Sequence, residues 1–173
     1  PVGLAIDGDG NVYVADSENR RIQVFDPEGR FLSKWGIRGD GDGEFDTPVG
    51  LAIDGDGNVY VADKDNYRIQ VFDPQGRFLR KWGTEGEEDG QFGESAELAI
   101  GGDGNVYVAD TDNHRIQVFD HQGRFLRKWG TEGTGDGQFD FPGGLAIGGD
   151  GNVYVADWFN HRIQVFKRVA SNG

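Results

Sequence analysis

The chain has 173 residues, of which 36% are hydrophobic and 30 are glycine, and it carries a formal net charge of −13. This acidity disfavours DNA and RNA as partners, because affinity for nucleic acids comes largely from Lys and Arg side chains that neutralise phosphates. The sequence has no cysteine, so no disulfide stabilises the fold, and no apolar run is long enough to cross a membrane.

One unit recurs four times along the chain, and each copy begins 47 residues after the previous one. Its most constant part is Asn11-Val-Tyr-Val-Ala-Asp16, followed by Arg21-Ile-Gln-Val-Phe25. A fixed period of this length is the signature of a stacked array of repeats. We therefore expect a single repeat domain over 1–173, made of repeats 1–47, 48–94, 95–141 and 142–173.

Four short strands are predicted within the first repeat. Val2–Ile6 is rich in small residues, and an Asp-Gly turn connects it to Val12–Ala15, whose continuous apolar run is typical of a strand covered on both faces. Arg21–Phe25 is the third predicted strand, and the more polar Phe31–Trp35 is the fourth. This gradient indicates that the strands run from the inside of the fold to its outside. A Gly-rich crossing, Gly36–Thr47, then leads to the next repeat.

Four antiparallel strands followed by a Gly-rich crossing are typical of a propeller blade. A helical interpretation fails because no apolar period of 3.6 extends beyond a single turn, and a β-helix would need shorter coils. The predicted fold class is therefore all-β: a β-propeller of four-stranded antiparallel blades. The fourth repeat has no counterpart of Phe31–Trp35 after Phe166, so its blade is predicted to lack the outer strand.

The recurring motifs Gly-Leu-Ala-Ile-Asp, Asp-Gly-Asn-Val-Tyr-Val-Ala-Asp and Asn-x-Arg-Ile-Gln-Val-Phe, closed by Gly-x-Phe-Leu-x-Lys-Trp-Gly, resemble the NHL-repeat β-propeller family over essentially the whole chain. The resemblance implies that one Asp, one Asn and one Arg per repeat fix the blade and take no part in catalysis. We accordingly expect replacement of Asp63 by Ala to lower thermal stability without altering ligand affinity. These positions are Asp16, Asp63, Asp110 and Asp157; Asn19, Asn66, Asn113 and Asn160; and Arg21, Arg68, Arg115 and Arg162.

The four repeats are so similar that they indicate recent duplication or deliberate design. The family's rings usually carry five or six blades. Four blades therefore close tightly, form an arc completed by a second chain, or belong to something longer. Among these, we expect a homo-oligomer, a dimer of four-blade halves that completes a larger ring, because the unpaired edge Ile163–Phe166 and the apolar end faces need cover.

The predicted core consists of apolar residues packed between adjacent blades. It comprises Val12, Val14, Ile22, Val24, Phe25 and Leu32 with their copies in the other repeats. Phe45, Phe92 and Phe139 are expected to anchor the crossing loops onto the blades.

Positions that differ between repeats are free to serve a local function. Most of them lie in the loop between the second and third strands, which is expected on the same face as the crossings. Trp158 and Phe159 replace small or charged residues there, and either cover the neighbouring crossing loop or contact a partner. Glu97 stands on an innermost strand where the other repeats have Gly. The candidate binding residues are Trp158, Phe159, Tyr67, His114, His161 and Glu97.

Metal and catalytic motifs are poorly supported. His114 and His161 occupy equivalent places on adjacent blades, which are expected to hold them too far apart to share one ion. Asp7-Gly-Asp-Gly-Asn11 resembles the start of a calcium loop, but no bidentate Glu follows, so a hairpin turn is the preferred interpretation. There is no Gly-x-Ser-x-Gly motif and no Cys nucleophile. We predict no metal site and no cofactor.

We expect a non-catalytic scaffold or interaction module that presents loops on one propeller face, with a protein or peptide as its partner there. The alternative is a metal-dependent lyase or hydrolase with its site at the propeller axis, as in some propellers that resemble the family. Glu97, His114 and His161 are the only candidates for that chemistry. An RNA-binding propeller, as in some animal members of the family, is disfavoured by the acidity.

Overall fold

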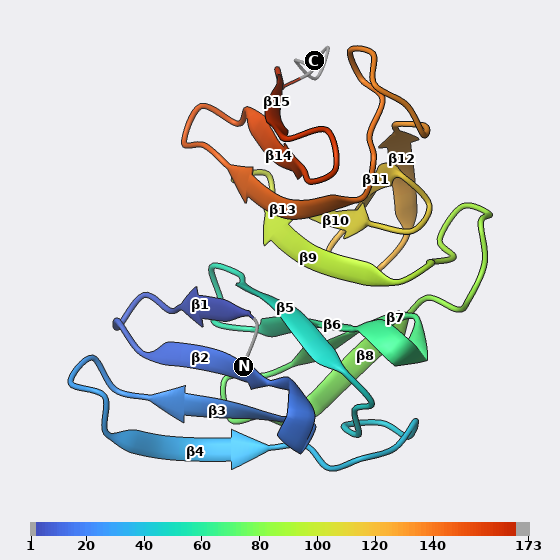
Figure 1. The fold of residues 1–173 in the computed structure, drawn as a ribbon. Helices are drawn as coiled ribbons and strands as arrows, with labels where there is room; N and C mark the ends of the chain where they lie inside the picture. Colours follow the sequence, from blue (N-terminus) through green and yellow to red (C-terminus); the bar gives the residue numbers. More distant parts are fainter. Residues whose placement is uncertain (1–2, 169–173) are drawn as a thin grey trace.

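The computed structural model describes residues 3–168 and consists of four antiparallel sheets, one per repeat (Figure 1). Within each sheet the strands pair in sequence order, and the last sheet has three strands instead of four. The predicted all-β propeller architecture is confirmed, including the missing outer strand of the fourth blade. The strands are β1 (Leu4–Ile6), β2 (Val12–Asp16), β3 (Arg21–Phe25) and β4 (Phe31–Trp35); β5 (Pro48–Ile53), β6 (Val59–Asp63), β7 (Arg68–Phe72) and β8 (Phe78–Trp82); β9 (Ser95–Ile100), β10 (Val106–Asp110), β11 (Arg115–Phe119) and β12 (Phe125–Trp129); β13 (Pro142–Ile147), β14 (Val153–Asp157) and β15 (Arg162–Phe166).

The blades follow one another in an arc, with the first and fourth blades at its two ends (Figure 1). The innermost strands β1, β5, β9 and β13 contact one another in that order. The only helical segments among the described residues are two short 3-10 turns, η1 (Ser17–Asn19) and η2 (Lys64–Asn66). In this part of the chain no helix has the length and apolarity needed to cross a membrane.

Each blade packs one face against the next blade, and we call this its leading face; the opposite face, against the preceding blade, is the trailing face. Side chains alternate between the two faces along every strand, so a continuous apolar run supplies both. At the first contact, the leading face of blade one and the trailing face of blade two are fully covered. The buried side chains are Tyr13, Ala15, Ile22 and Val24 on the leading face, and Leu51, Val59, Val61 and Phe72 on the trailing face.

The same contact recurs between blades two and three and between blades three and four. An aromatic pair completes each contact at the periphery, where the Trp of the outer strand lies against a Phe of the next blade. The ring centroids are 5.6 Å apart for Trp35 and Phe72, and 5.4 Å apart for Trp129 and Phe166. The crossing residues Phe45, Phe92 and Phe139 are completely buried, so their predicted role as loop anchors is confirmed.

The predicted core is confirmed at these contacts except for the leucine of the outer strand, and it is wrong for Ile163 and Val165 of blade four, which are 62% and 53% exposed. Leu32, Leu79 and Leu126 are 51%, 45% and 49% exposed, so their assignment to the core was wrong. The pairing of β3 with β4 shifts register between Val24 and Phe25, which pair with Ser33 and Phe31 and leave Leu32 between them as the extra residue of a bulge. A bulged residue is unpaired and leaves the alternation of the strand, which explains its exposure.

The two end blades each keep one uncovered apolar face. Ile22, Ile69 and Ile116 are completely buried on leading faces, whereas their equivalent in blade four, Ile163, is 62% exposed. On trailing faces, Leu51 is 4% exposed and its equivalent in blade one, Leu4, is 66% exposed. The middle strands β6 and β10 are buried throughout, because each has a blade on both sides. The exposed faces are thus the same surfaces that are buried inside the arc.

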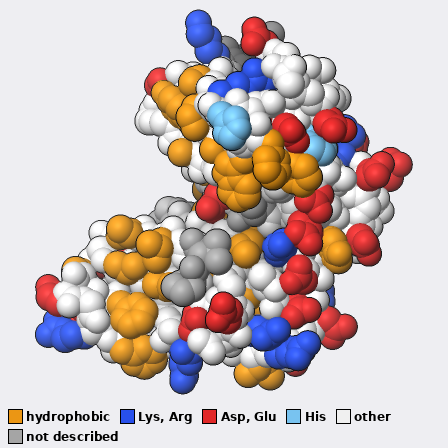
Figure 2. Space-filling model, viewed as in Figure 1, with side chains coloured by type: hydrophobic (Ala, Val, Ile, Leu, Met, Phe, Trp, Pro, Cys, Tyr) orange, Lys and Arg blue, Asp and Glu red, His pale blue; other side chains and the backbone are white. Residues whose placement is uncertain are grey.

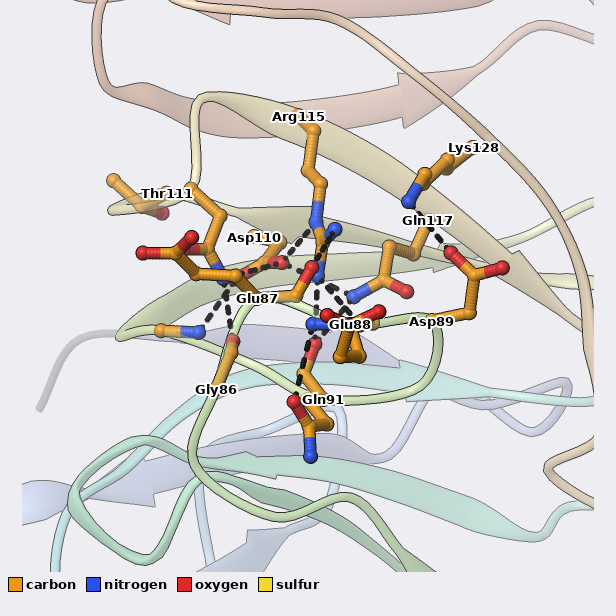
Figure 3. A network of polar contacts seen from close by, with 12 residues as sticks. Gly86, Glu87, Glu88, Asp89, Gln91, Asp110, Thr111, Arg115, Gln117 and Lys128 are labelled. Carbon is orange, nitrogen blue, oxygen red and sulfur yellow. Dashed lines mark hydrogen bonds and ion pairs between the residues drawn. The ribbon is translucent and has the colours of Figure 1, made fainter.

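The constant Asp, Asn and Arg of each repeat fix the crossing loop that arrives from the preceding blade (Figure 3). Arg115 donates from Nε to Asp110 at 2.6 Å, and its terminal nitrogens donate to the backbone carbonyls of Glu87, Glu88 and Gln91 at 2.5, 2.9 and 3.0 Å. Both side chains are nearly inaccessible, with 7% of Arg115 and none of Asp110 exposed. The blade-fixing role implied by the family resemblance is confirmed.

The first repeat contains the same Arg without a preceding crossing among the described residues. Arg21 donates to Asp16 at 2.7 Å, and its side chain is 30% exposed. The hydrogen bond from Arg21 holds the pKa of the Asp16 carboxyl below its ordinary value. The repeats therefore provide matched pairs of residues that differ only in whether a neighbouring blade covers them.

Replacement of Ile69 by Ala is expected to lower the free energy of unfolding by roughly 2–5 kcal/mol, because it removes a completely buried side chain and leaves a cavity. The same replacement at the exposed Ile163 is expected to cost less than about 1 kcal/mol in the isolated chain. Urea unfolding of the two variants measures the difference. Equal costs would contradict the assignment of buried and open leading faces.

Replacement of Arg115 by Ala is expected to cost roughly 3–5 kcal/mol, because it leaves the buried Asp110 carboxylate without its cationic partner and removes a donor from three loop carbonyls. Replacement of Arg21, the half-exposed equivalent, is expected to cost about 1 kcal/mol or less. Urea titrations followed by far-UV circular dichroism measure the free energy of unfolding of both variants. If Arg21 proves as costly as Arg115, the crossing loop does not contribute as described.

Candidate functional site

The loops between second and third strands lie against the crossings, on one face of the arc, as predicted. The contacts between them are direct: Asn66 donates to the carbonyl of Gly39, Asn113 to that of Gly86 and Asn160 to that of Gly133. We call this surface the loop face. Because its framework is held by constant residues, the variable residues of each repeat decide its chemistry.

A cleft of about 680 Å³ opens on the loop face where blades two, three and four meet. Each of these three blades contributes residues from its innermost strand or from the loops beside it. The lining residues are Thr47, Val49, Lys64, Glu94, Ser95, Thr111, Asp112, Phe141, Trp158 and Phe159. A volume of this size is within the range of sites that hold a small molecule or a few side chains of a peptide.

Aromatic side chains form one wall of the cleft. Trp158 and Phe159 are 54% and 61% exposed. They also cover the crossing loop: the ring of Phe159 meets that of Phe141 edge to face at 5.1 Å, and the Trp158 indole lies so close to Gly143 that a Cβ there would be 2.0 Å from it. The two interpretations of this pair, as cover for the crossing and as an exposed contact surface, therefore describe two sides of the same rings. Figure 2 shows hydrophobic and acidic side chains gathered side by side, with histidines at the edge of the hydrophobic group.

Phe141 is a member of this wall that the sequence reasoning missed. Its backbone has a φ of 54°, a left-handed conformation that is costly for a bulky residue. The imidazole of His114 packs on its ring at 4.8 Å, and Nδ1 of that histidine accepts the Phe141 amide N–H at 3.3 Å. The signal was present in the repeat comparison, since the equivalent positions are Thr47 and Glu94. His114 is thus brought to the cleft through Phe141.

Polar side chains are among the other residues that line the cleft. Ser95 is 4% exposed, and its hydroxyl has no hydrogen-bond partner among the described residues. Lys64 pairs with Glu94 at 2.6 Å. Burial, with a further contribution from the Glu94 charge, raises the pKa of the Asp112 carboxyl above its ordinary value. The cleft therefore combines an aromatic wall, a buried hydroxyl and a carboxylate that a cation would stabilise.

Of the six predicted site residues, Trp158 and Phe159 line the cleft, and the other four do not. His161 is exposed and lies with Ile163 on the far side of Trp158. Tyr67 is half-buried in blade two, and the charge of Glu85 raises the pKa of its phenol. Within residues 3–168 no three His, Cys, Asp or Glu side chains gather as metal ligands would. The Asp7 carboxylate accepts the backbone amides of Asp9 and Asn11 at 3.0 and 2.9 Å, which is the geometry of a hairpin turn.

Glu97 lies on β9, the innermost strand of blade three. Its side chain is close to β5, the innermost strand of blade two. Burial raises the pKa of its carboxyl to about 7, against the opposing effect of two backbone amides, those of Leu98 and of Leu51 on the preceding blade. The Leu98 amide donates to Oε1 at 3.1 Å. The side chain is therefore held in the crevice between two inner strands, and it is not among the residues that line the cleft.

Replacement of Glu97 by Gln is expected to stabilise the protein above pH 7 and to have little effect below pH 4.5. The folded state holds the Glu97 proton more tightly than the unfolded chain, with a pKa of about 7 against 4.5, so stability falls as pH rises through this window. Gln does not ionise, and the variant should gain up to about 3 kcal/mol above the window. Thermal unfolding at several pH values, with the exposed Glu18 changed to Gln as control, tests this. A difference independent of pH would contradict the buried placement.

Comparisons with known proteins agree with the repeat architecture. The family model described as the NHL repeat matches residues 1–25, 45–72, 97–119 and 139–166, which together are more than half of the chain. Over 48 residues the chain is 42% identical to Protein brain tumor of Drosophila melanogaster, which covers 28% of this chain and 5% of that protein. Over 31 residues it is 61% identical to the B-box type zinc finger protein ncl-1 of Caenorhabditis elegans, which covers 18% and 4%. The chain thus spans only a small part of the length of these curated relatives.

Solved structures with little sequence identity share the fold. A streptogramin B lyase superposes with a TM-score of 0.71 at 14% identity, covering 98% of this chain and 55% of that chain. Virginiamycin B lyase from Staphylococcus aureus superposes with a TM-score of 0.70 at 15% identity, covering 99% and 56%. Likeness at this level of identity concerns the fold alone. From the match of all four repeats to the family model, the chain belongs to the NHL repeat family.

Proposed function

We propose that this chain is a non-catalytic interaction module whose loop-face cleft binds a peptide segment carrying both apolar and basic side chains. The observation that carries the proposal is the composition of the cleft. Trp158 and Phe159 offer exposed aromatic rings beside a buried Ser95 hydroxyl that has no partner among the described residues. Exposed aromatic residues that line a concave surface are the usual anchors of protein interfaces.

The aromatic rings, the Ser95 hydroxyl and the Asp112 carboxylate of the cleft each match one part of such a peptide. An apolar side chain gains by removing surface from water against Phe141, Trp158 and Phe159. The Ser95 hydroxyl supplies a hydrogen bond to the peptide backbone, and it is a costly group to leave unpaired. Asp112 favours a Lys or Arg, because a nearby cation offsets the desolvation and the Glu94 charge that now raise its pKa.

The wider electrostatics favour a basic ligand. The chain carries a net charge of −13, and the crossing that fixes blade three contributes Glu87, Glu88 and Asp89 to the loop face. Of these, Asp89 is paired with Lys128. A negative surface attracts and orients basic segments, and it repels phosphate backbones. We therefore also propose that RNA and DNA are not partners.

The alternative, a metal-dependent lyase or hydrolase at the axis, would need Glu97 to work with other polar groups. Its raised pKa of about 7 is suited to acid–base chemistry. The groups close to its carboxylate are backbone amides, and the two histidines lie elsewhere, with His114 against Phe141 and His161 beside Trp158. Calorimetric titration with Ca²⁺ and with Zn²⁺ tests the metal requirement of this alternative.

The peptide proposal predicts selective binding of short synthetic peptides that alternate Lys and Phe. Peptides that alternate Glu and Phe, or Lys and Ser, are expected to bind at least tenfold more weakly, because each lacks one of the two matching features. Fluorescence polarisation with labelled peptides measures the affinities. A mixed-sequence single-stranded RNA serves as the nucleic-acid comparison, and no binding is expected.

Replacing Trp158 and Phe159 together by Ala should weaken binding of the Lys–Phe peptide tenfold or more. Replacing Asp112 by Asn should also weaken binding of this peptide, and it should remove the preference of the cleft for the Lys–Phe peptide over the Glu–Phe peptide. Changing Leu126 to Ala provides the control, because this leucine is similarly exposed but lies on outer strand β12, far from the cleft lining. Unchanged affinity in the Trp158 and Phe159 variant, or equal affinity for all peptides, would refute the proposed site.

A further inference from the structure

We propose that the leading face of blade four binds the trailing face of blade one on a second copy of this chain, and that two copies close head to tail into one ring. Inside the arc, the same pair of faces already forms three contacts. Within residues 3–168, the ends of the arc present the two halves of that contact exposed to solvent. The proposal concerns assembly, and it is independent of what the cleft binds.

The two end faces are complementary because each has copies that bind one another. The leading face of blade four exposes Tyr154, Ile163 and Val165 by 39%, 62% and 53%, whereas their equivalents in blade two, Tyr60, Ile69 and Val71, are at most 1% exposed. The trailing face of blade one exposes Leu4, Ile6 and Phe31 by 66%, 67% and 54%. The copies of these residues in blades two and three pack into the contacts inside the arc. A second copy therefore needs no new recognition surface.

The pattern of exposure identifies these faces as unfinished contacts. In β2 the partly exposed residues are Val12 and Val14, which point to the trailing side. In β14 the uncovered residues are Tyr154 and Ala156, which point to the leading side. β2 and β14 have the same sequence, but the residues that are exposed in one are the equivalents of those that are buried in the other. Large contiguous apolar surfaces of this kind on soluble proteins mark contacts with other molecules.

This chain superposes on the streptogramin B lyase with a TM-score of 0.71 and covers 55% of its length, which leaves 45%, about four fifths of the stretch that this chain covers. Two copies therefore fit into one ring only if each arc opens relative to that structure. A head-to-tail contact that closes gives a finite ring, whereas one that does not close gives an open filament.

The contact between copies is weaker than the contacts inside the arc. The last blade has three strands among the described residues, so none of them supplies an equivalent of Trp35 to Phe25 of the second copy. No covalent crossing brings carbonyls to Arg21, as the crossing before blade three brings them to Arg115. Each copy also carries a net charge of −13, which opposes association. Screening by salt reduces that repulsion, so association is expected to strengthen with ionic strength.

Sedimentation equilibrium of the whole chain over a wide range of concentration tests the proposal. We expect twice the mass of one chain at high concentration, with the dissociation constant falling as salt is raised. The variant Val165→Lys places a charge in the leading face of blade four and should sediment as a single chain. Leu79→Lys is the control, because Leu79 is 45% exposed on outer strand β8 and lies on neither end face. Circular dichroism and thermal unfolding verify that both variants are folded.

Mixing two disabled variants distinguishes head-to-tail contact from face-to-same-face contact. Leu4→Lys blocks the trailing face of blade one, so alone it should also sediment as a single chain. An equimolar mixture of Leu4→Lys and Val165→Lys retains one intact contact, and it should form a two-chain species at concentrations at which neither variant does alone. Contact between two leading faces would instead leave Leu4→Lys dimeric.

Three results would overturn the proposal. The first is a single-chain mass for the unaltered protein at every concentration and salt level, which would assign the end faces to another occupant. The second is a series of species that grows without limit, which would show that the ring does not close. The third is a Val165→Lys variant that remains dimeric. Peptide binding is measured separately, as the affinity of the Val165→Lys variant for the Lys–Phe peptide. Val165 is not among the residues of the cleft, so this affinity tests the proposed function independently of assembly.

Discussion

The packing of one blade's leading face on the next blade's trailing face is the interaction on which the rest of the structure depends. A single blade is a thin sheet that is apolar on both faces, so it cannot hide its side chains from water by itself. The repeat solves this by supplying the same two complementary faces every 47 residues. Middle strands such as β6 and β10 are buried throughout as a result. The loop face and its cleft exist only because successive blades are held in this order.

The polar framework of the loop face separates stability from recognition. Arg115, Asp110 and their copies hold each crossing through backbone carbonyls, so the side chains of the crossing are free to vary. The cleft uses such variation, since Ser95 and Phe141 of the third repeat and Trp158 of the fourth have no counterpart at the equivalent positions of the other repeats. A nearly symmetric scaffold thereby acquires one asymmetric site.

Much of the fold could be predicted because its determinants are local and repeated. Turn chemistry and continuous apolar runs are visible in a single repeat and predict β3 at Arg21–Phe25, and comparison of the repeats predicts the missing outer strand. The exposed Leu32 could not be predicted, because a bulge is decided by how two strands pair. The cleft could be predicted only in part. Comparison of repeats identifies Trp158 and Phe159, but it does not reveal that Phe141 joins them to His114 or that Glu97 lies between inner strands.

The contact of each crossing with the blade that follows it has a consequence for how the chain folds. Arg115 reaches carbonyls only 24 to 28 residues earlier in the sequence, and each buried apolar cluster joins two neighbouring repeats. Such a chain has short loops to close and resembles a one-dimensional lattice, in which order spreads from an initial pair of blades to their neighbours. In a single copy of the chain, amide hydrogens of the middle blades would then exchange most slowly, and the outer blades would open first, because within residues 3–168 each has a neighbouring blade on one side only.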